Sequence, residues 1–323
     1  MWMRPADTIL QMKLKISEEA GGLRLDQALS RQIPEHSRAR IQQWIRDGAV
    51  LVDGVARRAK DRVYGGEMIE IDAAERMEQT GVQPQNLPIE CIHADEDLIV
   101  IDKVAGMVVH PAAGHFDGTL QNALLYHFPE LAAVPRAGIV HRLDKDTSGL
   151  MVVARSLHAH THLVNQLQSR EMGREYEAVV HGVMVAGGTV DAPIGRHPVD
   201  RKRMAVVSNG KPAVTHYRLA HKFASHTHLR IKLQTGRTHQ IRVHMAHIRY
   251  PIVGDPVYGG RKRIPAAASE QLIEALRSFP RQALHAARLE LNHPVSEERL
   301  SWQSALPDDM QQLLQQLKHD AGE

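Results

Sequence analysis

Residues 141–154 read His-Arg-Leu-Asp-Lys-Asp-Thr-Ser-Gly-Leu-Met-Val-Val-Ala, a polar turn that leads directly into an apolar run. The run is typical of a buried strand, and catalytic groups concentrate in loops held by rigid strands, because the scaffold fixes their geometry. The stretch therefore predicts a functional loop at the edge of a sheet. Composition alone favours a simpler interpretation, a surface turn in which Arg142, Asp144, Lys145 and Asp146 neutralise one another.

The composition bounds the class of protein. The chain has 323 residues, 43% of them hydrophobic, which suggests about two domains. The single cysteine, Cys91, excludes an internal disulfide and a cysteine-based zinc site, and it fits a reducing compartment. The N-terminus lacks the basic-then-apolar order of a signal peptide, and no apolar run approaches the ~20 residues that span a bilayer. We therefore expect a cytoplasmic protein that does not enter membranes.

Residues 1–13 read as an N-terminal tail, and residues 14–72 predict a small module of two helices and a small sheet. The expected elements are a helix at Leu25–Leu29, a second helix after Ser37 as N-cap, and strands at Val50–Val52 and Met68–Ile71 around an Asp53-Gly54 turn.

This module carries a cluster of positive charge, and the excess predicts a face that contacts RNA phosphates, although charge alone fits an ordinary solvated helix equally well. The candidate RNA-binding residues are Arg38, Arg40, Arg46, Arg57, Arg58, Lys60 and Arg62, against Asp47, Asp53 and Asp61.

Residues 73–87 are polar, contain Gly81 and Pro84, and show neither helical nor strand periodicity, so we expect a linker. In residues 88–323, helices and strands mix without the strict alternation of a doubly wound fold. We therefore predict an α+β catalytic domain on a largely antiparallel mixed sheet with flanking helices and loops. The expected strands are Leu98–Ile101, Met107–Val109, Leu150–Val153, Tyr176–Val180, Leu229–Leu233 and Gln240–Val243, and the expected helices are Thr119–His127, Ser156–Glu171 and Ala266–Arg277.

The chain has 21 histidines, and three of them, His158, His160 and His162, are spaced by two. On the expected helix that spacing turns successive imidazoles roughly 200° apart, so they cannot converge on one ion. The chain also lacks GxGxxG after a strand, a Walker motif and HExxH. We therefore expect neither a metal site nor a cofactor.

Several strings beyond residues 141–154 match one family in the expected order. The whole set resembles the RluA-type pseudouridine synthases, and it spans almost the whole chain. The matching strings are Asp102-Lys103 with Gly106–Pro111, Thr235–His247, Pro251–Gly259, and Leu284–Ala286 with His293-Pro294.

The resemblance implies an isomerase that converts specific uridines in large-subunit ribosomal RNA to pseudouridine without a cofactor. It assigns the catalytic carboxylate to Asp144, the arginine paired with it to Arg242, and the ring that packs on the uracil to Tyr176. It also implies that Arg142 enters the RNA where the target base flips out, and that Leu289 or a neighbour lines the uracil pocket.

Two departures from the family pattern are visible. Val104 stands where the family usually has proline, and Arg174 stands where a lysine commonly precedes Glu175-Tyr176. Neither removes a group that the chemistry needs.

The N-terminal module resembles the S4 RNA-binding domain over roughly residues 23–72, through the strings Gly22–Leu29, Ser37–Arg40 and Gly48–Gly54. It implies RNA binding without chemistry. We expect the partner to be ribosomal RNA, either free or in an assembling large subunit, and the chain to act as a monomer.

Two other functions stay open. A glycoside hydrolase would use a carboxylate pair such as Asp144 and Asp146, and it would release a free base or sugar, whereas an isomerase leaves the mass unchanged. An RNA-binding protein without activity would lack the carboxylate or the arginine, and both Asp144 and Arg242 are present.

Overall fold

The computed structural model describes residues 8–34, 36, 38–75, 82–111, 117–201, 203–260 and 263–322. The chain divides into two compact units, Met1–Gln79 and Thr80–Glu323. In the part that the structure describes, no helix is long and apolar enough to cross a membrane.

The N-terminal unit packs two helices on a four-stranded antiparallel sheet of order β1-β4-β2-β3. Its core is a closed hydrophobic cluster that includes Leu25, Ile41, Trp44 and Ile69. The turn between β2 and β3 has positive φ at both Asp53 and Gly54, as a tight hairpin requires. The elements are β1 (Thr8–Lys15), a 3-10 turn (Glu18–Ala20), α1 (Leu25–Gln32), α2 (Arg38–Arg46), β2 (Val50–Val52), β3 (Val55–Ala56) and β4 (Met68–Glu75).

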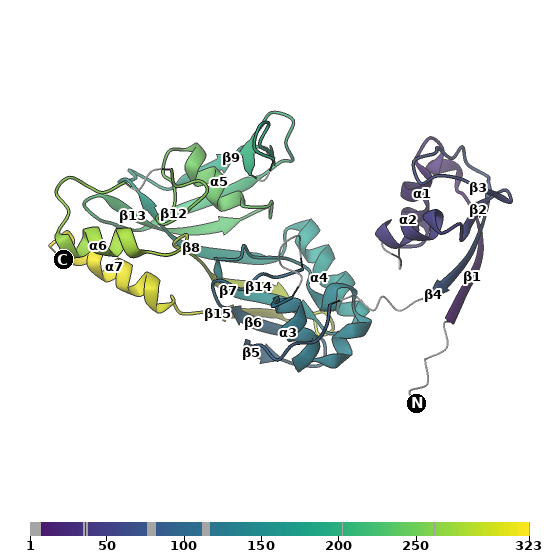
Figure 1. The fold of residues 1–323 in the computed structure, drawn as a ribbon, viewed down its shortest axis with the longest axis horizontal. Coiled ribbons are helices and arrows are strands. Elements are labelled where there is room, and N and C mark those ends of the chain that lie inside the picture. Colours follow the sequence, from purple (N-terminus) through teal and green to yellow (C-terminus); the bar gives the residue numbers. More distant parts are fainter. Residues whose placement is uncertain are drawn as a thin grey trace. The chain divides into compact units, whose positions relative to one another are not determined.

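The catalytic unit is built on a nine-stranded sheet of order β5-β6-β7-β14-β8-β13-β12-β9, with β15 paired to β14. Among the strand pairs of this sheet in the described residues, only β7–β14 is parallel, so the predicted α+β, largely antiparallel architecture is confirmed. Figure 1 shows the order of these elements. The strands are β5 (Glu90–Ala94), β6 (Leu98–Lys103), β7 (Ser148–Ala154), β8 (Gly173–His181), β9 (Gly188–Asp191), β12 (Val214–Lys222), β13 (His226–Leu233), β14 (Leu284–Asn292) and β15 (Arg299–Gln303), and β10 (Ile194–Arg196) pairs separately with β11 (Met204–Val206).

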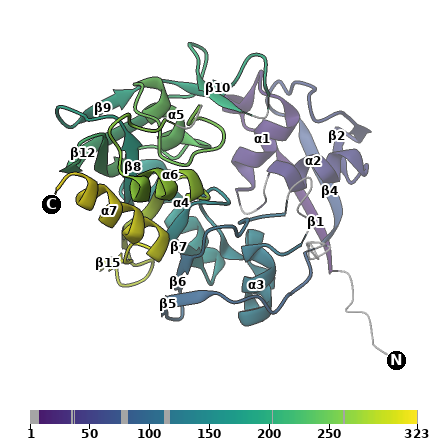
Figure 2. The ribbon, with the colours of Figure 1, turned by 60° about the vertical axis from the view of Figure 1, so that its left-hand side comes forward.

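The centre of the sheet is covered on both faces. Ile99 and Met151 belong to one hydrophobic cluster together with residues of α3, whereas Val100 and Val152 belong to another together with residues of α4. Burial on both faces explains why β6 and β7 read as continuous apolar runs. Figure 2 shows α6 beside α7, and both helices add apolar residues to the first cluster. The helices are α3 (Leu120–His127), α4 (Leu157–Ser169), α5 (Gln240–His247), α6 (Glu270–Ser278) and α7 (Asp308–Asp320), with 3-10 turns at Pro129–Ala133 and Pro135–Gly138.

Gly149 allows β7 to lie directly against β14. A Cβ atom at Gly149 would lie 2.3 Å from the backbone oxygen of Ala286, and the residue has a φ of +114°. A larger residue would therefore push apart the strands that hold the 141–147 loop.

The predicted strand at Gln240–Val243 is wrong, because these residues begin helix α5. Alternation of polar and apolar residues over so short a run fits a strand, but Ile241 and Met245, four residues apart, both enter the main core, which is helical spacing. The predicted strand at Met107–Val109 is also wrong, because Val108 forms only an isolated bridge with Thr119.

Several segment boundaries in the structure differ from the predicted ones, because the contacts that extend a strand or anchor a segment involve residues far apart in the sequence. Residues from Thr8 onward, expected in the tail, pair with β4, which itself runs through Glu75 into the expected linker. Residues 83–87 of the expected linker bind the catalytic unit, since Asn122 donates to the oxygen of Gln83 and the Gln85 amide donates to the oxygen of Asn122. The predicted helix at Ala266–Arg277 begins later, at Glu270 with Ser269 as N-cap. Ser37, the expected N-cap of the second helix, lies outside the described residues.

Candidate active site

A cleft of about 620 Å³ in the catalytic unit is lined by the loop before β7, the end of α4, β8, and the segment between β13 and α5. Among the described residues, Asp144 is the only carboxylate in the lining. Such a lining would attract a polyanion strongly. The arginines that line the cleft are Arg136, Arg142, Arg170, Arg174, Arg237 and Arg242.

Arg242 joins Asp144 to a second carboxylate. Its Nη1 donates to Oδ2 of Asp144 at 2.9 Å, while Nε and Nη2 donate to the two oxygens of Asp255 at 2.7 and 2.9 Å. The sequence predicted the first contact and missed the second, although Asp255 stands in one of the matched strings. The other Asp144 oxygen, Oδ1, makes no hydrogen bond among the described residues.

Asp255 is fully buried and holds the guanidinium in one orientation. The backbone amides of Val257 and Tyr258 also donate to its Oδ1. Burial would raise the pKa of Asp255, but the bonds from Arg242 and from these amides lower it overall. For Arg242, burial by itself would lower the pKa. The hydrogen bonds and negative charges of Asp255 and Asp144 outweigh burial, so the pKa of Arg242 is raised overall. The site is therefore one cation shared by two carboxylates.

Lys103 fixes the turn that carries Asp144. Its side chain is buried at the end of β6, and Nζ donates to the backbone oxygens of Val104, Met107 and Lys145 at 2.8, 3.0 and 3.0 Å. Burial lowers the pKa of Lys103 to about 8, and the charges of nearby carboxylates oppose part of that shift. Three carbonyl acceptors match the three N–H groups of an ammonium ion, so the geometry favours the charged form.

Arg281 holds the other side of the same turn. Its Nη1 donates to the backbone oxygen of Asp146 at 3.2 Å, while Nε and Nη2 bind the carboxylate of Asp309 on α7 at 2.6 and 2.7 Å. The neighbouring Gln282 donates to the hydroxyl of Thr147 at 3.1 Å. The C-terminal helix therefore stabilises the catalytic loop, which no sequence motif indicated.

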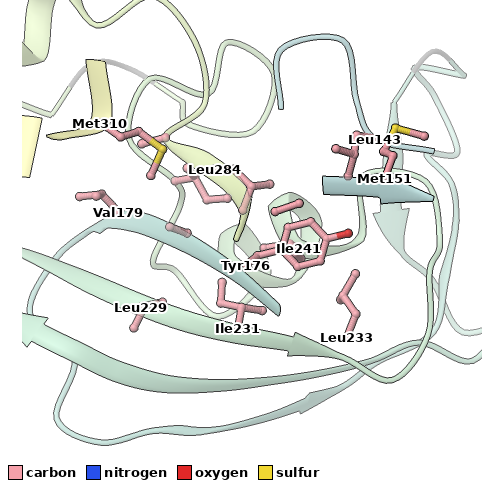
Figure 3. Packing of buried hydrophobic residues seen from close by; sticks show 14 of the residues in the cluster. Leu143, Met151, Tyr176, Val179, Leu229, Ile231, Leu233, Ile241, Leu284 and Met310 are labelled. Atoms are coloured by element: carbon pink, nitrogen blue, oxygen red, sulfur yellow. The ribbon is translucent and has the colours of Figure 1, made fainter. Parts of the chain in front are cut away.

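Tyr176 lies on β8 and is buried, with 6% of its surface exposed. In Figure 3 its ring lies beside Ile241, and its hydroxyl points between Leu143 and Leu233, which both line the cleft. Burial raises the pKa of Tyr176; the charge of Arg174 opposes that shift and the charge of Asp144 adds to it. The phenol therefore stays protonated beside the carboxylate, in a place where a flat base could contact its ring.

His239 and Tyr258 form a second polar group at Asp144. The Nε2 atom of His239 lies 3.8 Å from Oδ1 of Asp144, and its Nδ1 lies 2.9 Å from the hydroxyl of Tyr258, which accepts from the amide of Met204. Burial lowers the pKa of His239, the charge of Asp144 opposes this, and the charge of Arg242 adds to it, so the ring is neutral near pH 7. Neither residue had a role predicted from the sequence.

Two of the predicted RNA contacts in this unit have different outcomes. Arg142 is exposed and lines the cleft, so it is available to RNA. Leu289 is not in the lining: only 1% of its surface is exposed, and it packs with Leu98 and Leu291 in a separate hydrophobic cluster. Leu284, earlier on the same strand, lines the cleft, and a contact of Leu289 or a neighbour with the uracil stays a prediction.

The basic residues of the N-terminal unit differ in whether their side chains already make hydrogen bonds or ion pairs within the unit. Arg38 makes two bonds to the buried carboxylate of Asp26, so part of its charge is used inside the unit. Arg46 bonds Gln43, Arg58 pairs with Asp61, and Arg62 donates to the oxygen of Gly22. Arg40 lies over the ring of Trp44, and Arg57 and Lys60 complete the set. Their contact with RNA stays a prediction.

The three histidines His158, His160 and His162 lie on α4 as expected. In the described part of the chain, the group with metal-like spacing is instead Asp95, Asp97 and His293, outside the cleft. There, Nδ1 of His293 accepts from the amides of Val295 and Ser296, so its Nε2 carries the proton and faces Asp95. That geometry fits a contact between an imidazole N–H and the Asp95 carboxylate, and the expected absence of a metal stays a prediction.

A unit that resembles an RNA-binding domain, followed by a cationic cleft around a single carboxylate, defines a class of RNA-modifying enzymes. The RNA pseudouridylate synthase model matches residues 97–247, and the S4 domain model matches residues 23–69. The chain belongs to the RNA pseudouridylate synthase family, whose members isomerise uridine to pseudouridine.

Named relatives cover nearly the whole chain. The Ribosomal large subunit pseudouridine synthase D of Pseudomonas aeruginosa is 58% identical over 312 residues, covering 97% of each chain. The protein of the same name from Escherichia coli is 55% identical, covering 96% of this chain and 95% of that one. Among solved structures, Human RNA Pseudouridylate Synthase Domain Containing 4 matches with a TM-score of 0.57 and 27% identity, covering 71% of this chain and 93% of that chain.

Proposed function

We propose that this chain converts specific uridines of large-subunit ribosomal RNA to pseudouridine, with Asp144 as the catalytic carboxylate and no cofactor. The observation that carries the proposal is the Asp144–Arg242 bond in a cleft where arginines outnumber the single carboxylate. The names of the similar proteins and the S4 domain support ribosomal RNA as the substrate.

The reaction breaks the bond between N1 of uracil and C1′ of the ribose, turns the base, and joins C5 to C1′. The proton lost from C5 is replaced by one on N1, so no atom or electron is added. Asp144 presents Oδ1 to the reacting nucleotide, while the bond from Arg242 to Oδ2 holds the carboxylate in one orientation. Tyr176 holds the uracil ring, and its protonated hydroxyl is a donor within the cleft.

A glycoside hydrolase is supported less well. Such enzymes need two carboxyl groups on opposite sides of the scissile bond, about 5 to 9.5 Å apart. Among the described residues the cleft holds only Asp144, and Asp146, the second carboxylate of the pair suggested by the sequence, is not part of the lining. RNA binding without activity does not require a carboxylate in a cationic cleft, so the Asp144–Arg242 pair supports an enzyme over an inactive RNA-binding protein.

We further propose that the chain acts in the cytoplasm and as a monomer. The hydrophobic core of each unit is built from buried residues of that unit, which supports the second statement. The substrate is free ribosomal RNA or RNA in an assembling large subunit.

The experiment that tests the proposed function is incubation of the purified protein with large-subunit RNA, followed by position-resolved mapping of pseudouridine. The same RNA within a partly assembled subunit provides the comparison between the two forms of substrate. Discrete new pseudouridines are expected, with no release of uracil. Free uracil, or an RNA without new pseudouridine in either form, would contradict the proposal.

Arg242 is expected to act on turnover through Asp144. Arg242→Ala leaves two partly or fully buried carboxylates without their cation, a change that typically costs about 3–5 kcal/mol in a buried ion pair. Single-turnover rates should fall strongly, and Arg242→Lys should recover only part of the rate, because an ammonium cannot bridge both carboxylates with a fixed fork. Affinity for RNA, measured in parallel, should change less than the rate. Full turnover by a folded Arg242→Ala protein would contradict the pairing.

Removal of residues 1–79 is expected to leave a catalytic unit that still converts uridine, because every residue assigned to chemistry lies after Thr80. The truncated protein should bind RNA more weakly and choose its sites less accurately, because the tethered unit no longer adds its phosphate contacts. The fall of affinity with salt should also be shallower, by roughly 0.7 to 0.9 per lost phosphate contact in a plot of log K against log salt. Equal slopes and unchanged site choice would mean that the basic face of the N-terminal unit is only a solvated surface.

A further inference from the structure

Arg174 is a buried cation that has no anionic partner among the residues that the structure describes. Only 8% of its surface is exposed, and its Nε has no hydrogen-bond partner among the described residues. Arg242, buried to a similar degree in the same cleft, has two carboxylates. A buried charge without a partner costs several kcal/mol, so an unpaired guanidinium facing a cleft indicates a ligand that completes it.

The position of the guanidinium is built into the site. A Cβ atom at Gly236 would lie 2.7 Å from Nη1 of Arg174, so the glycine leaves the space that the guanidinium uses. The charge of Arg174 adds to the effect of burial in lowering the pKa of His141 to about 3, so the neighbouring ring is neutral. All three residues line the cleft, and Asp144, the one carboxylate in the described lining, is bound to Arg242. The missing anion must therefore come from the substrate.

We propose that Arg174 binds a backbone phosphate of the substrate RNA next to the target nucleotide. This inference rests on the proposed function. Arg174 and Tyr176 are two residues apart on β8, so they face the same side at a separation of roughly 7 Å. A nucleotide whose base lies on Tyr176 brings its own phosphate within reach of Arg174. The guanidinium fork fits two phosphate oxygens, whereas the lysine common at this position in the family would offer one point charge.

The test uses a short RNA that contains a uridine converted by the wild-type enzyme, with binding measured in the Asp144→Asn background so that no turnover occurs. One version of the RNA carries an uncharged methylphosphonate linkage on the 5′ side of that uridine, and another carries it on the 3′ side. With Arg174 present, one of these linkages should weaken binding by about 10- to 100-fold, as expected for a lost charged hydrogen bond. With Arg174→Gln the same linkage should cost almost nothing, and with Arg174→Lys the cost should be intermediate.

Gly236→Ala is a matched test of the geometry. The atom that the new Cβ would meet is the end of a flexible side chain, so the protein should fold while the guanidinium is displaced. Its loss of affinity should match that of Arg174→Gln and should not add to it. If Arg174→Gln leaves the methylphosphonate penalty unchanged at both positions, Arg174 has a structural role and the inference is overturned.

The role of Arg174 can be tested even if the proposed function is wrong. If the wild-type enzyme converts no uridine of large-subunit RNA, the salt dependence of affinity for that RNA still decides the role of Arg174, because it needs no turnover. Arg174→Gln should then reduce the slope by roughly 0.7 to 0.9, and an unchanged slope overturns the inference.

Discussion

Asp144→Asn is expected to reduce turnover by on the order of 10⁴-fold or more, the scale of loss when a group essential to the chemical step is removed. The substitution keeps the shape of the side chain and removes the negative charge that Arg242 aims into the cleft. Arg242 keeps both of its bonds to Asp255, so the fold and the shape of the cleft should persist. Affinity for RNA should therefore change little, by about threefold at most, since one loss of negative charge in a cationic cleft is small against many phosphate contacts.

The matched control is Asp146→Asn, which changes the same charge two residues away. The Asp146 side chain is not in the lining of the cleft, and the turn uses its backbone oxygen, which the substitution keeps. Asp146→Asn should retain most of the turnover. Single-turnover conversion of a mapped uridine, measured for both variants at saturating enzyme, separates the chemical step from binding. Substantial product from purified Asp144→Asn, or equal losses of turnover in the two variants, would contradict the assignment of Asp144 as the catalytic carboxylate.

The sequence predicted the principal pair of the site because that pair lies in long, specific strings. Asp144 and Arg242 are 98 residues apart in the chain and are joined by a 2.9 Å bond in the structure. The string around Arg242 predicted its contact with Asp144, but the strand expected there is wrong, since Gln240 begins a helix. Gln240 helps to explain this: its side-chain amide donates to the oxygen of Val214 and the hydroxyl of Thr215, which ties the start of α5 to β12. A tie between distant segments leaves no periodic signal in the sequence.

The residues that the sequence missed are those whose role depends on burial and on distant partners. Asp255 is important because it is fully buried against Arg242, and Arg281 because it binds Asp309 on a helix near the C-terminus. In the sequence Arg174 is only a basic residue in place of another, whereas the structure places Gly236 beside its guanidinium and leaves its Nε without a hydrogen-bond partner among the described residues. The roles of these residues depend on which distant residues they contact in the folded chain, and residue type alone does not predict those contacts.

Buried neutral histidines are expected to make the catalytic unit sensitive to acid. Burial is the main cause that lowers the pKa of His141 to about 3 and those of His181 and His226 to about 4, from 6.5 in an unfolded chain. His181 and His226 also share a hydrogen bond of 3.1 Å between ring nitrogens, which a second proton would break. Between about pH 6.5 and pH 4 the unfolded chain therefore binds protons that the folded unit excludes.

The sign of the effect follows from proton linkage. Where the unfolded state binds more protons, the free energy of unfolding falls as pH falls, by about 1.4 kcal/mol per pH unit for each such group. Three histidines give a slope of about 4 kcal/mol per pH unit in the middle of the window, against a total stability of about 5–15 kcal/mol for a typical domain. Asp255 does not contribute to this window, because its lowered pKa places its loss of stability below its ordinary value of 3.8.

We therefore expect the full-length protein to be stable near pH 7 and to lose the structure of its catalytic unit at about pH 5. The measurement is the free energy of unfolding in urea from pH 7.5 to 5. His226→Gln keeps an amide donor and acceptor without a titratable ring, so it should reduce the slope by about 1.4 kcal/mol per pH unit whatever it does to the absolute stability. His158→Gln, at an exposed position on α4, should leave the slope unchanged. A slope near zero between pH 6.5 and 5, or an equal change in both variants, would show that these histidines take up protons in the folded protein and that their burial does not control its stability.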